Sequence, residues 1–122
     1  IEDNDVNRDI VVRQLRALGI NASQAADGLQ GFECWRRTRP AVVLLDCHMP
    51  GLDGYTVARK IRRAQGDRLP RTTIVAISAN ATSDDVRACR EAGMDDYLAK
   101  PITRMKLAAM LKKWLETVDV DV

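Results

Sequence analysis

The chain has 122 residues, of which 46% are hydrophobic and 30% charged, a composition that suits one soluble globular domain rather than two. Its 19 basic and 17 acidic residues leave a net charge of +2, so nothing in the composition indicates direct contact with nucleic acid. No apolar run approaches the ~20 residues that span a bilayer, and no signal peptide is visible, so we expect no membrane contact by this domain. Three widely spaced cysteines fit neither a disulfide framework nor a zinc pattern, which favours the reducing cytoplasm.

Strands and helices are predicted to alternate along the chain. The opening residues, 1–4, contain one apolar side chain, too few for a strand, so we expect the first strand to be truncated at the N-terminus. Further strands are predicted over 21–26 (weak, polar and best placed at a sheet edge), 42–46, 72–78 and 96–99. Helices are predicted over 6–18, 29–37, 55–65, from 82 to about 92 and from 103 to about 116.

This alternation predicts an α/β fold with helices on both faces of a parallel sheet. With five strand–helix units, we expect a flavodoxin-like (βα)5 three-layer sandwich with strand order 2-1-3-4-5. The domain is expected to cover residues 1–117. Residues 118–122 alternate apolar and acidic side chains and are expected to form a tail or linker.

One stretch stands out as the centre of the domain. Five apolar residues, 41–45, lead directly into Asp46, and turn-forming residues follow. A continuous apolar run predicts a strand that is covered on both faces. A carboxylate at the carboxyl end of such a strand lies where open α/β sheets place their chemistry. From this stretch alone, Asp46 is either a phosphoryl acceptor or merely the cap of a turn.

Polar residues follow the other predicted strands at the same edge of the sheet. The acidic pair Glu2-Asp3 ends the first strand, Ser78 the fourth and Lys100 the fifth. Three carboxylates that meet in one cleft repel one another, and a hard divalent cation such as Mg²⁺ would offset this repulsion. Phosphoryl transfer to Asp46 would then be stabilised by the metal, the Lys100 ammonium and the Ser78 hydroxyl.

At this point the chain resembles a known family over nearly its whole length. The residues that carry the resemblance are the acidic pair Glu2-Asp3, the loop 46–54, Ser78-Ala79 and Lys100-Pro101. Together they look like a response-regulator receiver domain (CheY-like) of two-component signalling. Each motif is weak alone, but the combination is highly specific.

The resemblance implies a role for each matching residue. Asp46 would be the phosphoacceptor, with Lys100 and Ser78 assisting the transfer. The implied ligands of Mg²⁺ (or Mn²⁺) are Asp3, Asp46, Glu2 through water and the backbone carbonyl of His48. Ser78 and Tyr97 would be the switch residues, and the peptide bond before Pro101 is expected to be cis.

The residues in and around these motifs are most similar to those of receivers inside tripartite hybrid sensor histidine kinases (BvgS/EvgS-like). This similarity implies a phosphorelay that passes a phosphoryl group from a kinase phosphohistidine to a histidine phosphotransfer domain. The parent would then be a protein histidine kinase, and this domain its cytoplasmic, self-phosphorylating and monomeric acceptor rather than a turnover enzyme.

Two other classes remain as alternatives. The domain could be the receiver of a DNA-binding response regulator, which the sequence beyond Val122 would reveal. More distantly, an aspartyl-nucleophile phosphatase also uses an Asp at a strand end. Those enzymes resemble an Asp-x-Asp pattern, whereas His48 stands at the second position here.

Several side chains keep two interpretations. The His48 ring is expected to be a loop side chain rather than a ligand, and Tyr97 could simply pack against the core. Asn80 is expected to tune access to the phosphoryl group. Cys47 lacks a general base that would make it a catalyst. The first helix carries more apolar residues than one stripe can bury, namely Val6, Ile10, Val11, Val12, Leu15 and Leu18. The excess is either ordinary or a docking patch for a four-helix phosphotransfer partner.

Overall fold

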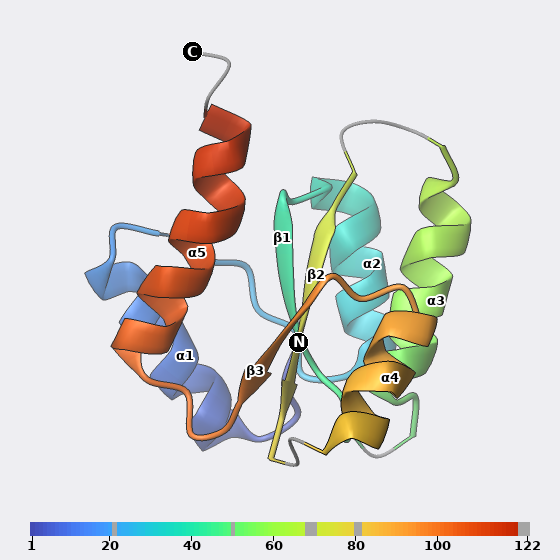
Figure 1. Cartoon of the computed structure of the whole chain (residues 1–122), viewed down its shortest axis with the longest axis horizontal. Coiled ribbons are helices and arrows are strands. Elements are labelled where there is room, and N and C mark those ends of the chain that lie inside the picture. Colours follow the sequence, from blue (N-terminus) through green and yellow to red (C-terminus); the bar gives the residue numbers. More distant parts are fainter. Residues whose placement is uncertain (21, 50, 68–70, 80–81, 120–122) are drawn as a thin grey trace.

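A parallel sheet with helices on both faces forms the domain (Figure 1). The computed structural model describes residues 1–20, 22–49, 51–67, 71–79 and 82–119, with side chains as far as residue 114. Strands β1, β2 and β3 span Val42–Asp46, Thr73–Ser78 and Asp96–Ala99. They pair in parallel in the order β1-β2-β3. The predicted α/β class is therefore confirmed.

The five helices begin where the sequence predicts a capping side chain. They span Asp5–Ala17 (α1), Gly28–Thr38 (α2), Gly54–Gln65 (α3), Ser83–Glu91 (α4) and Arg104–Asp119 (α5). The capping side chains belong to Asn4, Asp27, Asp53, Thr82 and Thr103, and each accepts a hydrogen bond from a backbone N–H three residues later. A side-chain oxygen at this position satisfies a donor that the first turn cannot pair, so helix starts were predictable from local sequence.

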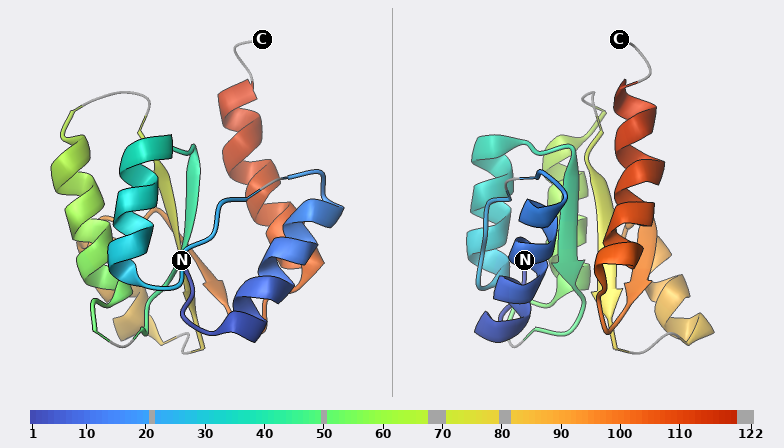
Figure 2. Two further views of the ribbon diagram at one scale, coloured as in Figure 1. Left: turned by 180° about the vertical axis from the view of Figure 1, so that it is seen from behind. Right: turned by 90° about the vertical axis from the view of Figure 1, so that its left-hand side faces the viewer.

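The two faces of the sheet have separate apolar cores. Helices α2, α3 and α4 cover one face, and α1 and α5 cover the other (Figures 1 and 2). Along β1, Val43 and Leu45 point into the first core, while Val42 and Leu44 pack against the second. Burial on both faces explains why this strand shows no alternation of apolar and polar residues.

We predicted an edge strand over 21–26. Residues 22–26 do not form one, and residue 21 lies outside the described residues. Ile1 occupies the place beside β1, because its nitrogen donates to Leu44 O at 2.6 Å and its carbonyl accepts from Asp46 N at 3.0 Å. Glu2 N in turn donates to Ala25 O at 3.1 Å. The segments thus follow the predicted order across the sheet. Since only Ile1 and Glu2 lie between residues 22–26 and β1, there is too little backbone for a ladder.

A cavity of about 750 Å³ lies beside Ile1. Its lining is mostly apolar and includes Val11 and Leu15 of α1, Leu44 of β1 and Leu111 of α5. Of the α1 residues, only Leu15 is buried. The bond from Gln14 Nε2 to Ile102 O, 3.2 Å, ties α1 to the segment that leads into α5.

Helix α5 continues to Asp119, past the end that we predicted near Glu116. No Gly or Pro follows Glu116, so nothing local stops the helix. Residues 120–122 of the predicted tail lie outside the described residues, and the domain boundary at residue 117 stays a prediction. Within the described part of the chain, no helix combines the length and apolar character that crossing a membrane requires.

Candidate functional site

The ends of the parallel strands bring the predicted site residues to one edge of the sheet. Asp46 is the last residue of β1, Ser78 is the last of β2, and Lys100 directly follows β3. The strand pairing continues to this edge, because Cys47 N donates to Ile77 O at 3.0 Å and Lys100 N donates to Ser78 O at 2.8 Å. Parallel pairing therefore converts distant sequence positions into neighbours.

Three carboxyl groups form an acidic cluster at this edge. One oxygen from each of Glu2, Asp3 and Asp46 lies within 4.8 Å of the others. Asp46 is 3% exposed, whereas Asp3 is exposed. Burial raises the pKa of Glu2 to about 7, and the hydrogen bond and charge of Asp46 add to the effect. Such a cluster has the chemistry of a hard divalent cation site, because Mg²⁺ prefers carboxylate oxygens and relieves their repulsion.

Lys100 is the cation that faces the cluster. Its Nζ lies 3.1 Å from Asp46 Oδ2 and 3.8 Å from Glu2 Oε2. Burial works against the ammonium, but the hydrogen bond and charge of Asp46, followed by the charge of Glu2, outweigh it and raise the pKa of Lys100. Lys100 is therefore charged at neutral pH and pairs with the most buried carboxylate of the cluster.

Both oxygens of Asp46 are held in place. Lys100 binds Oδ2, and the backbone N–H of His48 donates to Oδ1 at 3.0 Å. The strand end is also packed against the start of α3, where Gly54 N donates to Cys47 O at 3.2 Å. A side chain at Gly54 would collide with the Asp46 carbonyl, so only glycine permits this close approach.

The loop that carries Lys100 has its own supports. The Lys100–Pro101 peptide bond is cis, as we expected. The ammonium of Lys106 donates to the carbonyls of Ala99 at 3.0 Å and Pro101 at 3.1 Å, on either side of Lys100. Lys106 was not among the predicted site residues, because an exposed lysine in the first turn of a helix carries no distinguishing signal.

Other predicted residues lie around this centre. Ser78 is fully buried next to the strand end, and Tyr97 is half-buried and packs against the core that α2, α3 and α4 share. The exposed His48 ring meets Tyr55 edge-on, with ring centroids 6.2 Å apart. Its ring is thus a loop side chain, as predicted, and it does not join the acidic cluster. Asn80 lies outside the described residues.

Arg8 is a second residue that the sequence analysis did not select. Its Nη1 donates to the Glu2 backbone carbonyl at 2.9 Å, and its Nη2 pairs with Asp5. Arg8 therefore steadies the segment that presents Glu2 and Asp3. Its position one turn after the cap Asn4 was the only available signal, and this signal is common to many helices.

Burial also separates Cys47 from nucleophilic catalysis. Burial and the neighbouring Cys89 raise the pKa of the Cys47 thiol to about 12, so it stays protonated at neutral pH. Because the thiolate is the nucleophile, this protonation makes Cys47 a slow nucleophile at neutral pH.

The sheet order, the acidic cluster and the facing lysine define a carboxylate-rich site at the carboxyl edge of an α/β sheet. The chain belongs to the response regulator receiver domain family, whose match covers residues 1–112. It is 41% identical over 118 residues to the hybrid signal transduction protein dokA of Dictyostelium discoideum, covering 95% of this chain. The chain spans only 7% of the length of that relative.

Solved structures agree with this family. The receiver domain of sensor histidine kinase PA1611 from Pseudomonas aeruginosa PAO1, which has a magnesium ion coordinated in its active site cleft, is 40% identical with a TM-score of 0.84, over 95% of this chain and 93% of that one. A chain of the co-crystal structure of the Saccharomyces cerevisiae phosphotransfer protein Ypd1 and the receiver domain of Ssk1 is 27% identical with a TM-score of 0.85, over 93% of this chain and 83% of that one.

Proposed function

We propose that this chain is the phosphoacceptor of a phosphorelay and takes a phosphoryl group from a phosphohistidine onto Asp46. The observation that carries the proposal is the 3.1 Å contact between Lys100 Nζ and Asp46 Oδ2 inside the acidic cluster. A carboxylate can attack phosphorus to form an acyl phosphate. An ammonium fixed beside it stabilises the negative charge that the phosphoryl oxygens carry in the transition state.

The acidic cluster would hold Mg²⁺ or, alternatively, Mn²⁺. The proposed ligands are Asp3, Asp46, Glu2 through water, and the backbone carbonyl of His48. The magnesium ion in the cleft of the related PA1611 receiver supports this assignment, as do the three carboxylates within 4.8 Å. When bound, the ion supplies charge neutralisation for the transferring group.

The residues of this chain orient the nucleophile. The N–H of His48 and the ammonium of Lys100 hold the two oxygens of Asp46, which limits rotation of the carboxylate before attack. As the donor's nitrogen–phosphorus bond breaks, a bond forms between an Asp46 oxygen and phosphorus, and the imidazole leaves. Lys100 remains close enough to share its charge between Asp46 and the incoming oxygens.

The switch residues would transmit the change. We expect the new phosphoryl dianion to draw the Ser78 hydroxyl inward and Tyr97 to rotate into the vacated space. The position of these residues on the adjacent strands β2 and β3 supports this step, which would bias the surface formed by α4, β3 and α5. Addition of beryllofluoride should move the NMR signals of this surface, and unchanged signals would contradict the proposed switch.

The α1–α5 patch, defined as Val6, Ile10 and Met105, is the proposed docking surface for a histidine phosphotransfer domain. These side chains are 67%, 44% and 82% exposed. Helices α1 and α5 lie side by side (Figures 1 and 2). Together, apolar side chains on two neighbouring helices would offer a protein partner a shared apolar surface. The likeness to a receiver crystallised with Ypd1 supports a partner of this class.

For the parent protein, we propose a hybrid histidine kinase with this monomeric domain in its cytoplasmic part. The name of the relative dokA supports a hybrid parent. The alternative, a DNA-binding response regulator, predicts a DNA-binding module in the sequence beyond Val122, whereas a hybrid kinase predicts a phosphotransfer histidine helix. A phosphatase would turn over a phosphomonoester substrate, and we expect no such turnover.

Intact-mass analysis tests the central assignment. With acetyl phosphate and Mg²⁺, the wild-type chain should gain one phosphoryl group that hydroxylamine removes, as an acyl phosphate requires. The Asp46→Asn variant should gain none. The matched control is Asp84→Asn, because Asp84 is an exposed carboxylate on α4 and should keep full labelling. Labelling of Asp46→Asn at the wild-type level would overturn the proposal.

A further inference from the structure

Two cysteine thiols meet in the core next to the proposed phosphoacceptor. The sulfurs of Cys47 and Cys89 are 3.7 Å apart, and the two residues are 0% and 3% exposed. They come from elements that are distant in sequence, since Cys47 directly follows Asp46 at the end of β1 and Cys89 belongs to α4. The third cysteine, Cys34, lies on α2 and lines the cavity beside Ile1.

This contact lies where α4 packs into the core. Cys89 is the only residue within the helix that is buried. The partner sulfur is attached to the segment that presents Asp46, and the next residue, His48, donates its N–H to Asp46 Oδ1. A covalent bond between the two sulfurs would therefore link α4 to the backbone segment that presents Asp46.

We propose that Cys47 and Cys89 form a dithiol–disulfide modification site, at which a hydroperoxide couples the end of β1 to α4. The sulfurs must approach by roughly 1.7 Å to reach the S–S bond length of about 2.05 Å. Rotation of the two side chains and a small shift of α4 can supply this approach, because α4 buries only one residue.

The chemistry balances with hydrogen peroxide as the oxidant. One sulfur loses its proton and attacks a peroxide oxygen, the oxygen–oxygen bond breaks, and a sulfenic acid and one water form. The second sulfur displaces hydroxide from the sulfenic acid, which forms the disulfide and a second water. Both sulfurs are oxidised, the peroxide is reduced, and a dithiol reductant reverses the reaction.

The environment sets the rate and the selectivity. The two sulfur-bearing residues are buried in the core, so peroxide reaches them with difficulty and coupling should be slower than oxidation of an exposed thiolate. Their proximity favours the intramolecular disulfide over stepwise oxidation of either sulfur. The bond would close a long loop and restrain the unfolded chain, so the oxidised protein should melt at a higher temperature.

Peptide mapping of the wild-type chain tests the proposal without any use of phosphorylation. The folded protein is treated with hydrogen peroxide, unfolded in N-ethylmaleimide, and digested. We expect a cross-linked peptide pair that contains Cys47 and Cys89, a mass lower by two hydrogens, and recovery of both thiols after dithiothreitol. Peroxide treatment of the urea-unfolded chain is the control, and it should distribute the disulfides over all three cysteines.

A second measurement follows the opening of α4. Amide hydrogen exchange in α4 should slow after oxidation, and Cys34→Ser should behave like the wild type in both experiments. The proposal is overturned if Cys47 and Cys89 both remain alkylatable after peroxide treatment, if either accumulates as a sulfinic acid, or if the folded protein pairs Cys34 as readily as the other two. Phosphoryl labelling of Asp46 can fail or succeed independently of these outcomes.

Discussion

Replacing Lys100 by methionine removes the charge beside Asp46 and keeps much of the side-chain volume. With an effective dielectric constant of about 20, unit charges separated by the observed 3.1 Å attract by about 5 kcal/mol. Part of this attraction exists before transfer, and only the increase in the transition state lowers the barrier. The Lys100 side chain is also 28% exposed, so solvent screens it. We therefore expect a loss of about 3 kcal/mol, which corresponds to a roughly 10²-fold slower reaction.

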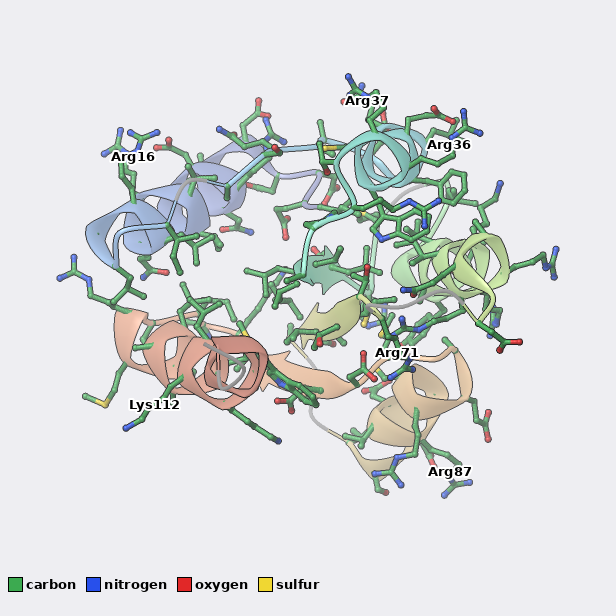
Figure 3. The ribbon with its side chains drawn as sticks, turned by 90° about the horizontal axis from the view of Figure 1, so that it is seen from above. Arg16, Arg36, Arg37, Arg71, Arg87 and Lys112 are labelled. Carbon is green, nitrogen blue, oxygen red and sulfur yellow. The ribbon has the colours of Figure 1, made fainter. Side chains whose placement is uncertain are left out.

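Time-resolved intact-mass analysis with acetyl phosphate and saturating Mg²⁺ measures this rate. The matched control is Lys112→Met, because Lys112 is exposed and its side chain points outward from α5 (Figure 3). The Lys112→Met substitution makes the same change in net charge, but far from the site. Calorimetric titration with Mg²⁺ should show undiminished or tighter binding by Lys100→Met, which verifies that the acidic cluster is intact. Equal labelling rates for Lys100→Met and Lys112→Met would show that the Lys100 charge does not assist the transfer.

Three further predictions concern the metal, the docking surface and the packing of the site. A ligand that binds only the folded state adds about 2.7 kcal/mol to the free energy of unfolding when its concentration is 100 times its dissociation constant. Mg²⁺ should therefore raise the melting temperature of the wild type and not of Asp46→Asn. An equal rise in both would contradict the metal assignment. Glutamate at both Val6 and Ile10 should slow transfer from a phosphorylated four-helix partner about tenfold without slowing labelling by acetyl phosphate. Leu29→Glu, at an apolar residue 64% exposed on α2, is the control, and slowing of both reactions would exclude the docking role. Gly54→Ala should lower the free energy of unfolding by about 1–3 kcal/mol, because its methyl group would collide with the Asp46 carbonyl; an unchanged denaturation midpoint would disprove this.

Much of the fold could be predicted because its signals are local. Capping side chains such as Asp53 and Thr82 mark helix starts, and the apolar run before Asp46 marks a strand buried on both faces. The predicted strand over 21–26 failed for a non-local reason. A strand needs a neighbouring backbone to pair with, and among the described residues the neighbouring chain meets this segment at one point, where Glu2 N donates to Ala25 O.

The site was predictable to a similar degree. Residues at strand ends were expected to converge, and the structure brings Glu2, Asp3, Asp46 and Lys100 together. The phosphoacceptor role of Asp46 and the assisting roles of Lys100 and Ser78 were proposed from their places at strand ends, whereas the particular metal ligands and the switch residues came from resemblance to a family. Lys106, which donates to carbonyls on both sides of Lys100, was not predictable, because a lysine on a helix surface looks the same whether or not it meets a loop.

Local sequence was sufficient to predict the helices, the strands β1, β2 and β3 and the side chains at their ends, since capping and apolar patterning act over a few residues. Two contacts followed only from the folded arrangement: Asp46 and Lys100, 54 positions apart, lie 3.1 Å from each other, and the thiols of Cys47 and Cys89 touch. Parallel pairing and helix packing set those distances. They depend on how whole elements dock, and no local pattern in the chain records them.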